Sequence, residues 1–480
     1  MAYRTGDRYQ MEMLPPCIEE YVAKDDPVRA YDAFVEALDL EQLGIVINPY
    51  KVGNPSYEPR AMLKLLVYGY SYGVKSSRKL ERELYHNLSF IWLMGGLKPD
   101  FKTIAEFRRN NKKVLKKVLL QCARMCLKLN LIAGNVLFVD GTKIRANASA
   151  EHSHDKGWYK KKLQEVDRRI ESLLQQSEAV DHQEEELDSF VAMDNELAQA
   201  ENLKEAIQDT LEAFEKTGCE KINHVDPDCA NMKGTGGKHA SYNVQSVVDD
   251  QNGLIVHAEA LNDKNDRQQF SRQVEQANEV LEKKCRTACA DSGYASTDEL
   301  EKVDTEGIEA IVPSQEQESG ATEDPFAKQQ FTYDRDNDCY YCPQGHQLSY
   351  VTTDTKLGKR YYQITDKRLC FACPHWGQCT PNKKSGRRIG RLKNEAVKEK
   401  LEAHYKEASS QVIYARRKKR VEHPFGHIKR NLKVDAFLLR GRDGVQAETS
   451  LLATCFNVAR MITLLGGVAG LVDQIKALPV

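Results

Sequence analysis

The sequence has almost no net charge, no apolar run long enough for a membrane helix and no apolar leader. Its 69 Lys and Arg residues against 70 Asp and Glu residues leave a formal net charge of −1, so the total charge gives no sign of a nucleic-acid-binding protein. The apolar stretch at 458–472 falls short of the roughly 18–20 apolar residues that a membrane helix needs, and we expect a packed helix end there. Met1 is followed by polar residues, which predicts no export signal, no membrane partner and a cytoplasmic location.

Charge is distributed unevenly along the chain. Basic residues gather at 108–117, 383–393 and 415–420, whereas residues 184–188 are acidic. Most runs of this kind are solvated helix faces, so each is only a candidate for DNA contact until other features support it. At 480 residues and 41% hydrophobic, the chain is long and apolar enough for two or three globular domains.

Residues 57–130 have the spacing of a small helical domain with a basic face. From Pro59 onwards one helical stripe is formed by Met62, Leu63, Leu65, Leu66 and Tyr70. A second helix is expected to start after residues 76–77. Thr103 with Glu106 forms a capping-box pattern, which predicts one long helix ending near residue 130. A plain helical bundle and a DNA-binding domain both fit this pattern.

The middle of the chain predicts a mixed α/β layer. Strand-like apolar runs occupy 136–140, 242–250, 253–261, 287–291 and 308–313, and residues 264–284 have helical spacing. The second and third runs are separated by a short turn and should form a hairpin. Strands that alternate with helices in this way are typical of a mixed sheet covered by helices.

Two insertions interrupt this layer. Residues 157–217 are helical and highly charged, and their apolar spacing predicts an antiparallel helical hairpin. This hairpin could be an interaction arm, an oligomerisation device or a passive spacer. Residues 314–393 are polar and loop-rich, with five cysteines between Cys339 and Cys379. Helical character then resumes near residue 394.

Three carboxylates stand out from their surroundings. Asp140 and Asp291 each end an apolar, strand-like run, and Glu422 lies in a basic segment. Carboxylates that bind two Mg²⁺ ions can activate a water and stabilise a leaving oxygen on a DNA strand. One acid at a strand end is usually structural, and Glu422 alone could be an ion-pair partner. The basic surroundings of Glu422, and Lys143 with Arg145 just after Asp140, favour a site that phosphate approaches.

Several motifs accompany these acids. They are residues 57–83, VDGTKIRANAS at 139–149, residues 226–266 and ADSGYAS at 290–296. With them the chain resembles bacterial insertion-sequence transposases of the DDE type, which have a ribonuclease-H-like catalytic core and an N-terminal helical domain. The resemblance covers nearly the whole chain.

The segment around Glu422 resembles the Y-x2-R-x3-E-x6-K signature of that family. Glu422 and Lys429 fit E-x6-K, and Tyr414 and Arg417 fit Y-x2-R. Four residues rather than three separate Arg417 from Glu422, and Lys418 stands where the strict spacing requires arginine. The role of Glu422 follows from the resemblance, whereas the choice between Arg417 and Lys418 stays open.

The resemblance implies a metal-dependent transfer of phosphodiester bonds. Asp140, Asp291 and Glu422 would bind two Mg²⁺ or Mn²⁺ ions, and water would cut DNA at the element's end to free a 3′-hydroxyl. That hydroxyl would attack target DNA in one in-line step, without a covalent enzyme intermediate. Lys429, two helical turns after Glu422, would hold a phosphate, and Tyr414 with Arg417 or Lys418 would contact the DNA ends.

The resemblance also implies partners and a domain plan. The partners are terminal inverted repeats, target DNA and a second protomer, since two ends must be paired, and the location is the bacterial nucleoid. The expected plan is an N-terminal helical DNA-binding domain at 1–130, a ribonuclease-H-like core at 131–156, 218–313 and 394–465, a helical hairpin at 157–217 and a cysteine-rich insertion at 314–393.

The clustered cysteines are a separate candidate site. Cys342, Cys370, Cys373 and Cys379 offer four thiolates, which can complete a tetrahedral zinc site. In a reducing cytosol such clusters favour metal over disulfides. Cys339 with Cys342 forms a competing Cys-x2-Cys pair. We expect a structural Zn²⁺ ion, with reduced and unligated cysteines as the alternative.

Two other functions compete with transposition. One is a catalytically inactive, repressor-like DNA-binding protein, although the presence of all three acids argues against simple inactivation. The other is a metal-dependent nuclease that cuts DNA without joining it. Strand-transfer products distinguish these possibilities.

Overall fold

The computed structural model describes residues 17–45, 57–180, 187–234, 236–318, 325–355, 358–380, 382 and 384–478, with side chains outside 176–194. It divides into two compact units. The first comprises Met1–Asn265, Gln273–Cys285 and Lys418–Val480, and the second comprises Asp266–Arg272 and Arg286–Arg417. Helices make up 53% and strands 17% of the protein. The predicted α/β class is confirmed.

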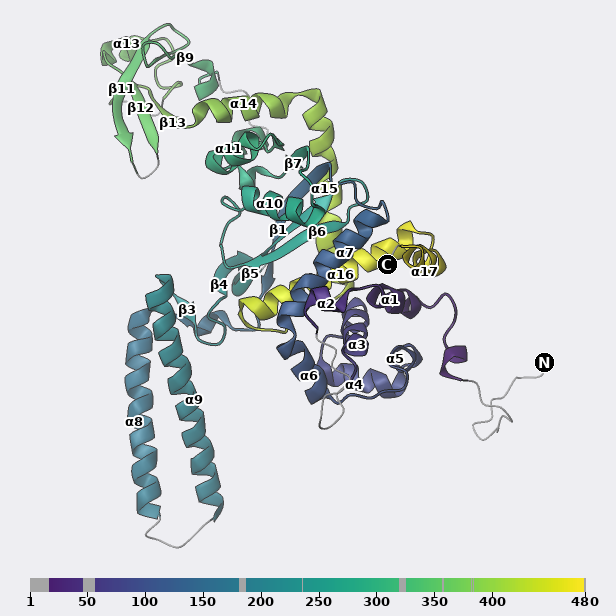
Figure 1. Ribbon diagram of the computed structural model, residues 1–480. Coiled ribbons are helices and arrows are strands. Elements are labelled where there is room, and N and C mark those ends of the chain that lie inside the picture. Colours follow the sequence, from purple (N-terminus) through teal and green to yellow (C-terminus); the bar gives the residue numbers. More distant parts are fainter. Residues whose placement is uncertain are drawn as a thin grey trace, which may run out of the picture. The chain divides into compact units, whose positions relative to one another are not determined.

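The first unit begins with short helices, drawn in purple and blue in Figure 1. They are η1 (Ile18–Tyr21), α1 (Pro27–Glu36), α2 (Leu40–Leu43), α3 (Pro59–Ser71), α4 (Ser77–His86), α5 (Leu88–Leu93), α6 (Phe101–Asn110) and α7 (Lys112–Lys128). The predicted stripe is confirmed, because all of its residues from Met62 to Tyr70 are buried in α3. The predicted start of a helix after residues 76–77 agrees with α4.

The expected single helix up to residue 130 is wrong in two respects. Asp100, rather than Thr103, caps the helix, since its carboxylate accepts a hydrogen bond of 2.7 Å from the Thr103 N–H. The helix then ends at Asn111, whose side-chain amide donates to the Phe107 carbonyl. A side chain that bonds the preceding turn competes with helical hydrogen bonds, and α7 starts afresh at Lys112.

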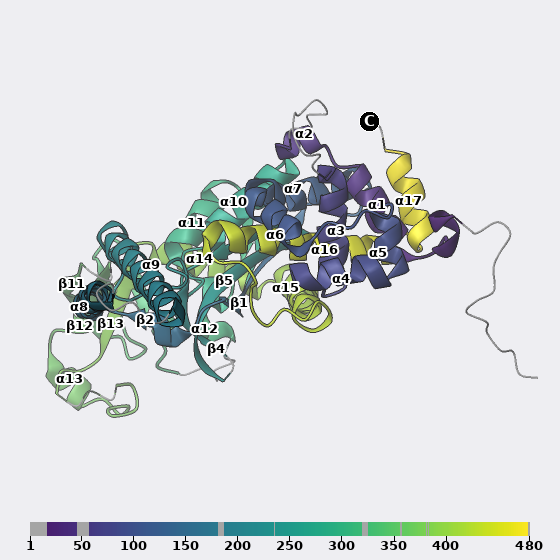
Figure 2. The same cartoon turned by 90° about the horizontal axis from the view of Figure 1, so that it is seen from below.

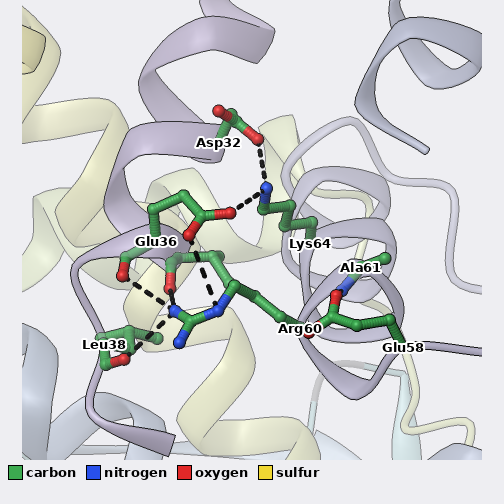
Figure 3. Close-up of polar contacts among 8 residues, drawn as sticks. Asp32, Glu36, Leu38, Glu58, Arg60, Ala61 and Lys64 are labelled. Carbon is green, nitrogen blue, oxygen red and sulfur yellow. Dashed lines mark hydrogen bonds and ion pairs between the residues drawn. The ribbon is translucent and has the colours of Figure 1, made fainter. Parts of the chain in front are cut away.

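Two cations of α3 hold the end of α1, as Figure 3 shows. The Arg60 guanidinium donates to the carbonyls of Val35, Glu36 and Leu38, at and just after the end of α1. The Lys64 ammonium lies 2.6 Å from Asp32 and 2.5 Å from Glu36. These contacts fix the packing of α1 on α3.

The strands of the first unit form an antiparallel sheet. Strand β5 (Gly237–Asp249) pairs with β1 (Val136–Arg145), β4 (Ala230–Gly234) and β6 (Ile255–Leu261). The expected hairpin of 242–250 and 253–261 is confirmed by β5 and β6. Strand β1 extends five residues past the predicted end at 140, so Asp140 lies within the strand, opposite Ser246.

The C-terminal helix α16 (Gly441–Leu464) is the central helix of this unit. It packs against α7, α3 and β6, and most of its residues are buried (Figures 1 and 2). Helix α17 (Val468–Lys476) follows α16 in the chain, and α10 (Phe270–Leu281) follows β6. The expectation of a packed helix at 458–472 is thus confirmed for the part within α16.

Among the described residues, no single helix is long and apolar enough to cross a membrane. The bent pair α16 and α17 meets the length and composition requirements together, at an angle of 101° between them.

The predicted helical hairpin at 157–217 is confirmed. It consists of α8 (Lys156–Val180) and α9 (Leu187–Thr217), which lie side by side in Figure 1. At its base, η2 (Ala150–His152) precedes a small ladder of β2 (Ser153–His154) and β3 (Ile222–Asn223). A separate apolar cluster includes Tyr159, Val166, Ile207, Phe214 and Ile222.

The second unit contains a short parallel pair of strands and a helical layer. Strand β7 (Thr287–Cys289) pairs with β8 (Glu309–Ile311). The helices are η3 (Ser292–Tyr294), α11 (Thr297–Thr305), α12 (Gln315–Glu318), η4 (Lys328–Gln330), α13 (Lys367–Phe371) and α14 (Glu395–Lys406). Helix α15 (Ala408–Gly426) begins here and continues into the first unit after Arg417.

The cysteine-rich segment is more regular than the sequence suggested. It forms a five-stranded antiparallel sheet of β9 (Thr332–Asp334), β10 (Cys339–Tyr341), β11 (Gln347–Asp354), β12 (Lys359–Ile364) and β13 (Arg388–Leu392). The sheet has its own core, which includes Tyr340, Leu348 and Tyr362. The loop-rich expectation for 314–393 was therefore wrong for these strands.

Candidate functional site

Asp140 lies in the middle of β1, in a half-buried position. Successive side chains of a strand point to opposite faces, so Asp140 shares a face with Thr142 and Ile144. Ile144 lines a small cavity with Phe425 of α15 and Ile428. This face of β1 is therefore the one that meets the segment bearing the third acid.

A lysine lies beside Asp140 on this face. Lys429 donates from Nζ to the Thr142 hydroxyl at 2.5 Å. Burial lowers the pKa of Lys429, and the nearby Asp140 carboxylate opposes that shift because it stabilises the charged ammonium. A half-buried cation next to a half-buried acid is suited to receive a phosphate oxygen.

Glu422 is exposed on α15 and forms no ion pair with any described residue. The neighbouring arginines and lysines do not neutralise it, so the ion-pair alternative receives no support. Past Glu422 the helix widens into a π-turn, η5 (His427–Asn431), where the Leu432 N–H donates to the His427 carbonyl five residues back. Pro424, which has no N–H to donate, precedes this change.

Regular helical spacing does not extend from Glu422 to Lys429, because the π-turn begins at His427, between them. Seven residues of regular α-helix would bring both to one face, but a wider turn rotates the residues that follow it. Glu422 is exposed, whereas Lys429 is half-buried against Thr142. The sequence could not reveal this, since spacing arguments assume a regular helix.

Lys143 and Arg145 lie on the opposite face of β1 from Asp140. The Lys143 Nζ donates to the Lys233 carbonyl of β4, and an Arg145 nitrogen lies 3.3 Å from the His239 ring of β5. The alternation of the strand separates them from the acid they follow in sequence. Lys143 and Arg145 were expected to meet phosphate beside Asp140 because the strand was expected to end at residue 140.

Asp291 belongs to the second unit and caps η3. Its carboxylate accepts a hydrogen bond of 2.9 Å from the Gly293 N–H. Burial raises the pKa of Asp291, and Arg417 opposes this shift, while Glu318 and Asp266 add to it. The Arg417 guanidinium lies 3.7 Å from the Asp291 carboxylate, with side chains 13% and 32% exposed respectively.

The ion pair distinguishes Arg417 from Lys418. Arg417 is half-buried beside the acid, whereas Lys418 is exposed and forms no ion pair among the described residues. The arginine also lies 5.5 Å from the centre of the Tyr414 ring. The position next to Asp291 is therefore occupied by Arg417, despite its irregular spacing from Glu422.

Sequence reasoning missed Glu318, which connects this loop to α15. One carboxylate oxygen accepts a hydrogen bond of 3.0 Å from the Tyr414 hydroxyl, and the other accepts one from the Ser292 hydroxyl. These hydrogen bonds lower the pKa of Glu318 against the effect of partial burial. Glu318 lies in a four-residue helix that no periodicity indicates, so the sequence offered no signal for it.

The carboxylates fit a hard divalent cation by their chemistry. Asp140 and Glu422 belong to the first unit and Asp291 to the second. Oxygen donors of this kind are the ligands that Mg²⁺ prefers. Within the described residues, no group of three or more His, Cys, Asp or Glu side chains lies close enough together to hold a metal ion.

Four cysteines line one cavity of about 30 Å³ in the second unit. They are Cys342, Cys370, Cys373 and Cys379, which are the four expected from sequence. Burial raises the pKa of the Cys379 thiol, and the other three thiols add to that shift, whereas Arg387 lowers it. Cys339 is buried in β10 and does not line the cavity, so the competing Cys-x2-Cys pair is not formed there.

Two family models match the chain. One, described as "Transposase domain (DUF772)", matches residues 16–110, and the other, described as "Transposase DDE domain", matches residues 341–462. Together they indicate an insertion-sequence DDE-type transposase. The predicted resemblance is confirmed. No curated protein matches the chain.

The matches support the general activity and leave its details open. DDE transposases act on DNA and generally use divalent metals. The DDE match includes Glu422, Lys429 and the four cavity cysteines, but neither match reaches Asp140 or Asp291. The roles of those two acids rest on the geometry around them.

Proposed function

We propose that this chain is a DNA transposase that binds terminal inverted repeats, cuts DNA at the element's ends and joins the 3′-hydroxyl ends to target DNA. One observation carries the proposal. The segment 414–429 supplies the cation beside Asp291, the cation beside Asp140 and the third acid, which are Arg417, Lys429 and Glu422. A structural helix has no need to bring a cation to each of two half-buried acids.

The chemistry follows from these groups. Divalent ions bound by Asp140, Asp291 and Glu422 would supply the activation of water and the stabilisation of the leaving 3′-oxygen. Lys429, next to Asp140, would orient a phosphate oxygen. Arg417 would keep the Asp291 carboxylate ionised and offer its remaining donors to the DNA end. Tyr414 and the exposed Lys418 would contact the backbone of the same end.

The cut and the join would be the same reaction with different nucleophiles. In the first step a water oxygen forms a bond to phosphorus, and the 3′-oxygen leaves with the proton that balances it. In the second step that 3′-hydroxyl forms the bond to a target phosphorus, and a target 3′-oxygen leaves. No oxidant or energy-rich cofactor is needed, since each step exchanges one phosphodiester oxygen for another.

The proposal also covers the partners of the protein and its division into domains. The helices of 1–130 would bind the inverted repeats, and 131–156, 218–313 and 394–465 would form a ribonuclease-H-like core. A homodimer would pair the two ends, and the 157–217 hairpin projects as a candidate arm for that pairing. The site of action would be the nucleoid in the bacterial cytoplasm.

The test uses the gene's own flanking DNA on a plasmid. Purified protein is added with Mg²⁺ or with EDTA, and cut and joined products are mapped by sequencing. We expect cuts at paired repeats and joined products that Asp291→Ala abolishes. Cuts without joining would identify a nuclease, and binding of the repeats without cuts by the unaltered chain would identify a repressor.

We also propose a structural Zn²⁺ ion at the cysteine cavity. Four thiolates from two separate segments, 342 and 370–379, line one space, and such a donor set fits zinc. Among the described residues, no group of three or more such side chains is already arranged to hold a metal ion, so the proposed ion would require the thiols to rearrange. A small sheet with a six-residue core gains stability from a cross-link of this kind.

Metal analysis tests the zinc proposal. We expect about one Zn²⁺ per chain in protein purified without added metal. Cys373→Ser should remove it and lower the thermal stability of the second unit, whereas Cys219→Ser, at an exposed cysteine, should do neither. Zinc-free protein whose four cavity thiols react freely with a thiol reagent would contradict the proposal.

A further inference from the structure

The last residue of the basic run 415–420 is held by a turn of the sheet. The Arg420 guanidinium donates a hydrogen bond of 3.1 Å to the Gln251 carbonyl, and its Nε lies 3.7 Å from an Asp250 carboxylate oxygen. The side chains of Arg420 and Asp250 are 28% and 13% exposed. The arginine therefore packs on the turn between β5 and β6, whereas its neighbour Lys419 is exposed.

The side chain of Arg420 also packs on a glycine of this turn. Gly253 has a φ angle of 70°, a backbone conformation that L side chains rarely adopt. A Cβ atom built at Gly253 would lie 3.6 Å from Cδ and 3.9 Å from a guanidinium nitrogen of Arg420. The arginine therefore lies beside the glycine backbone at van der Waals distance, in addition to its hydrogen bond and its ion pair.

The turn that holds the arginine is itself fixed to β1, the strand that bears Asp140. The Asp250 N–H donates a hydrogen bond of 3.1 Å to the carbonyl of Val136, the first residue of β1. The side-chain amide of Asn252 donates one of 2.8 Å to the Leu131 carbonyl, after the end of α7. Because these bonds hold the turn in place, a contact with the turn fixes α15 relative to β1.

Arg420 and Glu422 lie on opposite sides of the buried stripe of α15. Val421, between them, is 1% exposed and faces the core. Successive residues of a helix are about 100° apart, so the arginine projects to one side of Val421 and the glutamate to the other. A contact that holds one side of a helix limits the rotation of the helix about its own axis. That rotation sets the direction of the side chain on the other side.

We propose that Arg420 is a positioning residue. It fixes the rotation of α15, so that the Glu422 carboxylate keeps one direction for binding a divalent ion, and it makes no contact with DNA. The inference rests on the proposed function, in which Glu422 binds such an ion. It separates Arg420 from the exposed Lys419, although both belong to the basic run 415–420. Loss of a group that orients a metal ligand typically costs about 10–100-fold in metal affinity or activity.

Metal binding in the absence of DNA tests the proposal. Mn²⁺ is titrated into the full chain, and the free ion is measured by electron paramagnetic resonance. We expect Arg420→Ala to weaken Mn²⁺ binding by about tenfold, the lower end of the range for groups that orient metal ligands. Arg420→Lys keeps a cation beside Asp250 and should restore most of the affinity. Lys419→Ala is the matched control and should leave the affinity unchanged, because that side chain is exposed.

Two further measurements distinguish positioning from other roles of Arg420. Amide hydrogen exchange of residues 418–426 should rise about 2–10-fold in Arg420→Ala, the effect of losing one hydrogen bond. The slope of log K against log salt for DNA binding in EDTA should not change. A fall of about 0.9 in that slope would show a phosphate contact and overturn the proposal. A lower melting temperature with unchanged Mn²⁺ affinity would also overturn it, since the contact would then be structural only.

Failure of this proposal is distinguishable from failure of the proposed function. If the unaltered chain cuts its element's ends with Mg²⁺ but Arg420→Ala keeps the full affinity for Mn²⁺, the positioning role is overturned and transposition stands. If the affinity falls as expected but the unaltered chain never cuts, the positioning role stands and transposition fails. An unaltered chain that binds no Mn²⁺ would overturn both.

Discussion

The surroundings of Asp140 and Asp291 differ although each acid has a cation beside it. Asp291 makes an ion pair with Arg417, and Glu318 connects its loop to Tyr414. Lys429 donates a hydrogen bond to the Thr142 hydroxyl, and the charge of Asp140 raises the pKa of Lys429 against the effect of burial. Asp291 thus makes an ion pair with its cation, whereas the cation near Asp140 is hydrogen-bonded to the hydroxyl of Thr142.

Because of this difference, we expect Arg417 and Lys429 to have different roles. A guanidinium engaged by a carboxylate keeps that carboxylate ionised and in place, so Arg417 acts partly through Asp291. An ammonium hydrogen-bonded to a neutral hydroxyl keeps its charge available for an incoming phosphate, so in the proposed reaction Lys429 would contact the DNA directly. Substitutions at the two positions should therefore differ in size and in kind.

Among substitutions of the cations and their hydrogen-bond partners, loss of Arg417 should have the largest effect. Arg417→Ala leaves the half-buried Asp291 without its cation and, in the proposed reaction, would also remove a charge from beside the DNA end; losses of this kind lower rates by about 10²–10³. The rate of end cleavage in single turnover measures it. Lys418→Ala is the matched control and should cost less than about tenfold, since an exposed cation is worth little. Equal losses at 417 and 418 would remove the distinction between them.

A smaller effect is expected at the lysine. Lys429→Met keeps the length of the side chain but removes the charge, and we expect cleavage to fall by about 10–100-fold, the size of one charged contact of 1.4–3 kcal/mol. Lys429→Arg should restore part of the rate. Weakened binding of the element's end should accompany the loss. If Lys429→Met cleaved DNA at the normal rate, the contact between Lys429 and Thr142 would be structural only.

The smallest effect should come from the hydrogen bond between Glu318 and Tyr414. Glu318→Gln keeps an acceptor for Tyr414 but loses the charge, so we expect about a threefold to tenfold loss of rate, the cost of weakening one charge-assisted hydrogen bond. Tyr414→Phe should produce a similar loss. If the two side chains act through one hydrogen bond, the double variant should be no worse than either single variant. If instead the rate losses of the two single variants multiply in the double variant, Tyr414 contacts the DNA independently of Glu318.

Residue patterns identified the acids because each lies in a setting that sequence records directly. Apolar runs before Asp140 and Asp291 predicted buried strands, and the charge around Glu422 needed no fold to be seen. The two cations beside the acids were also named from sequence, through the signature around Glu422. Two local features of the backbone could not be predicted from the sequence. They are the extension of β1 to Arg145 and the π-turn that begins at His427.

The cysteine-rich segment was the least predictable part of the fold. Its strands are short, and exposed residues interrupt their alternation, as in β11, where most positions are exposed. Turn-forming residues between the strands favoured a loop, while the stabilising core of Tyr340, Leu348 and Tyr362 comes from pairing that spans the segment. The four cysteines named from sequence line one cavity, and their role as zinc ligands stays a prediction; the Cys-x2-Cys spacing accounts only for the proximity of Cys370 and Cys373.

The proposed reaction requires Asp140, Asp291 and Glu422 to act together with divalent metal ions. End cleavage with Mg²⁺ should be measured for the three single alanine variants and for their pairs, with folding checked by circular dichroism. Groups that act as a unit are strongly non-additive. We predict that each single variant abolishes cleavage and that no pair is measurably worse; a single variant that retains substantial activity, with losses that multiply in the pairs, would contradict the account.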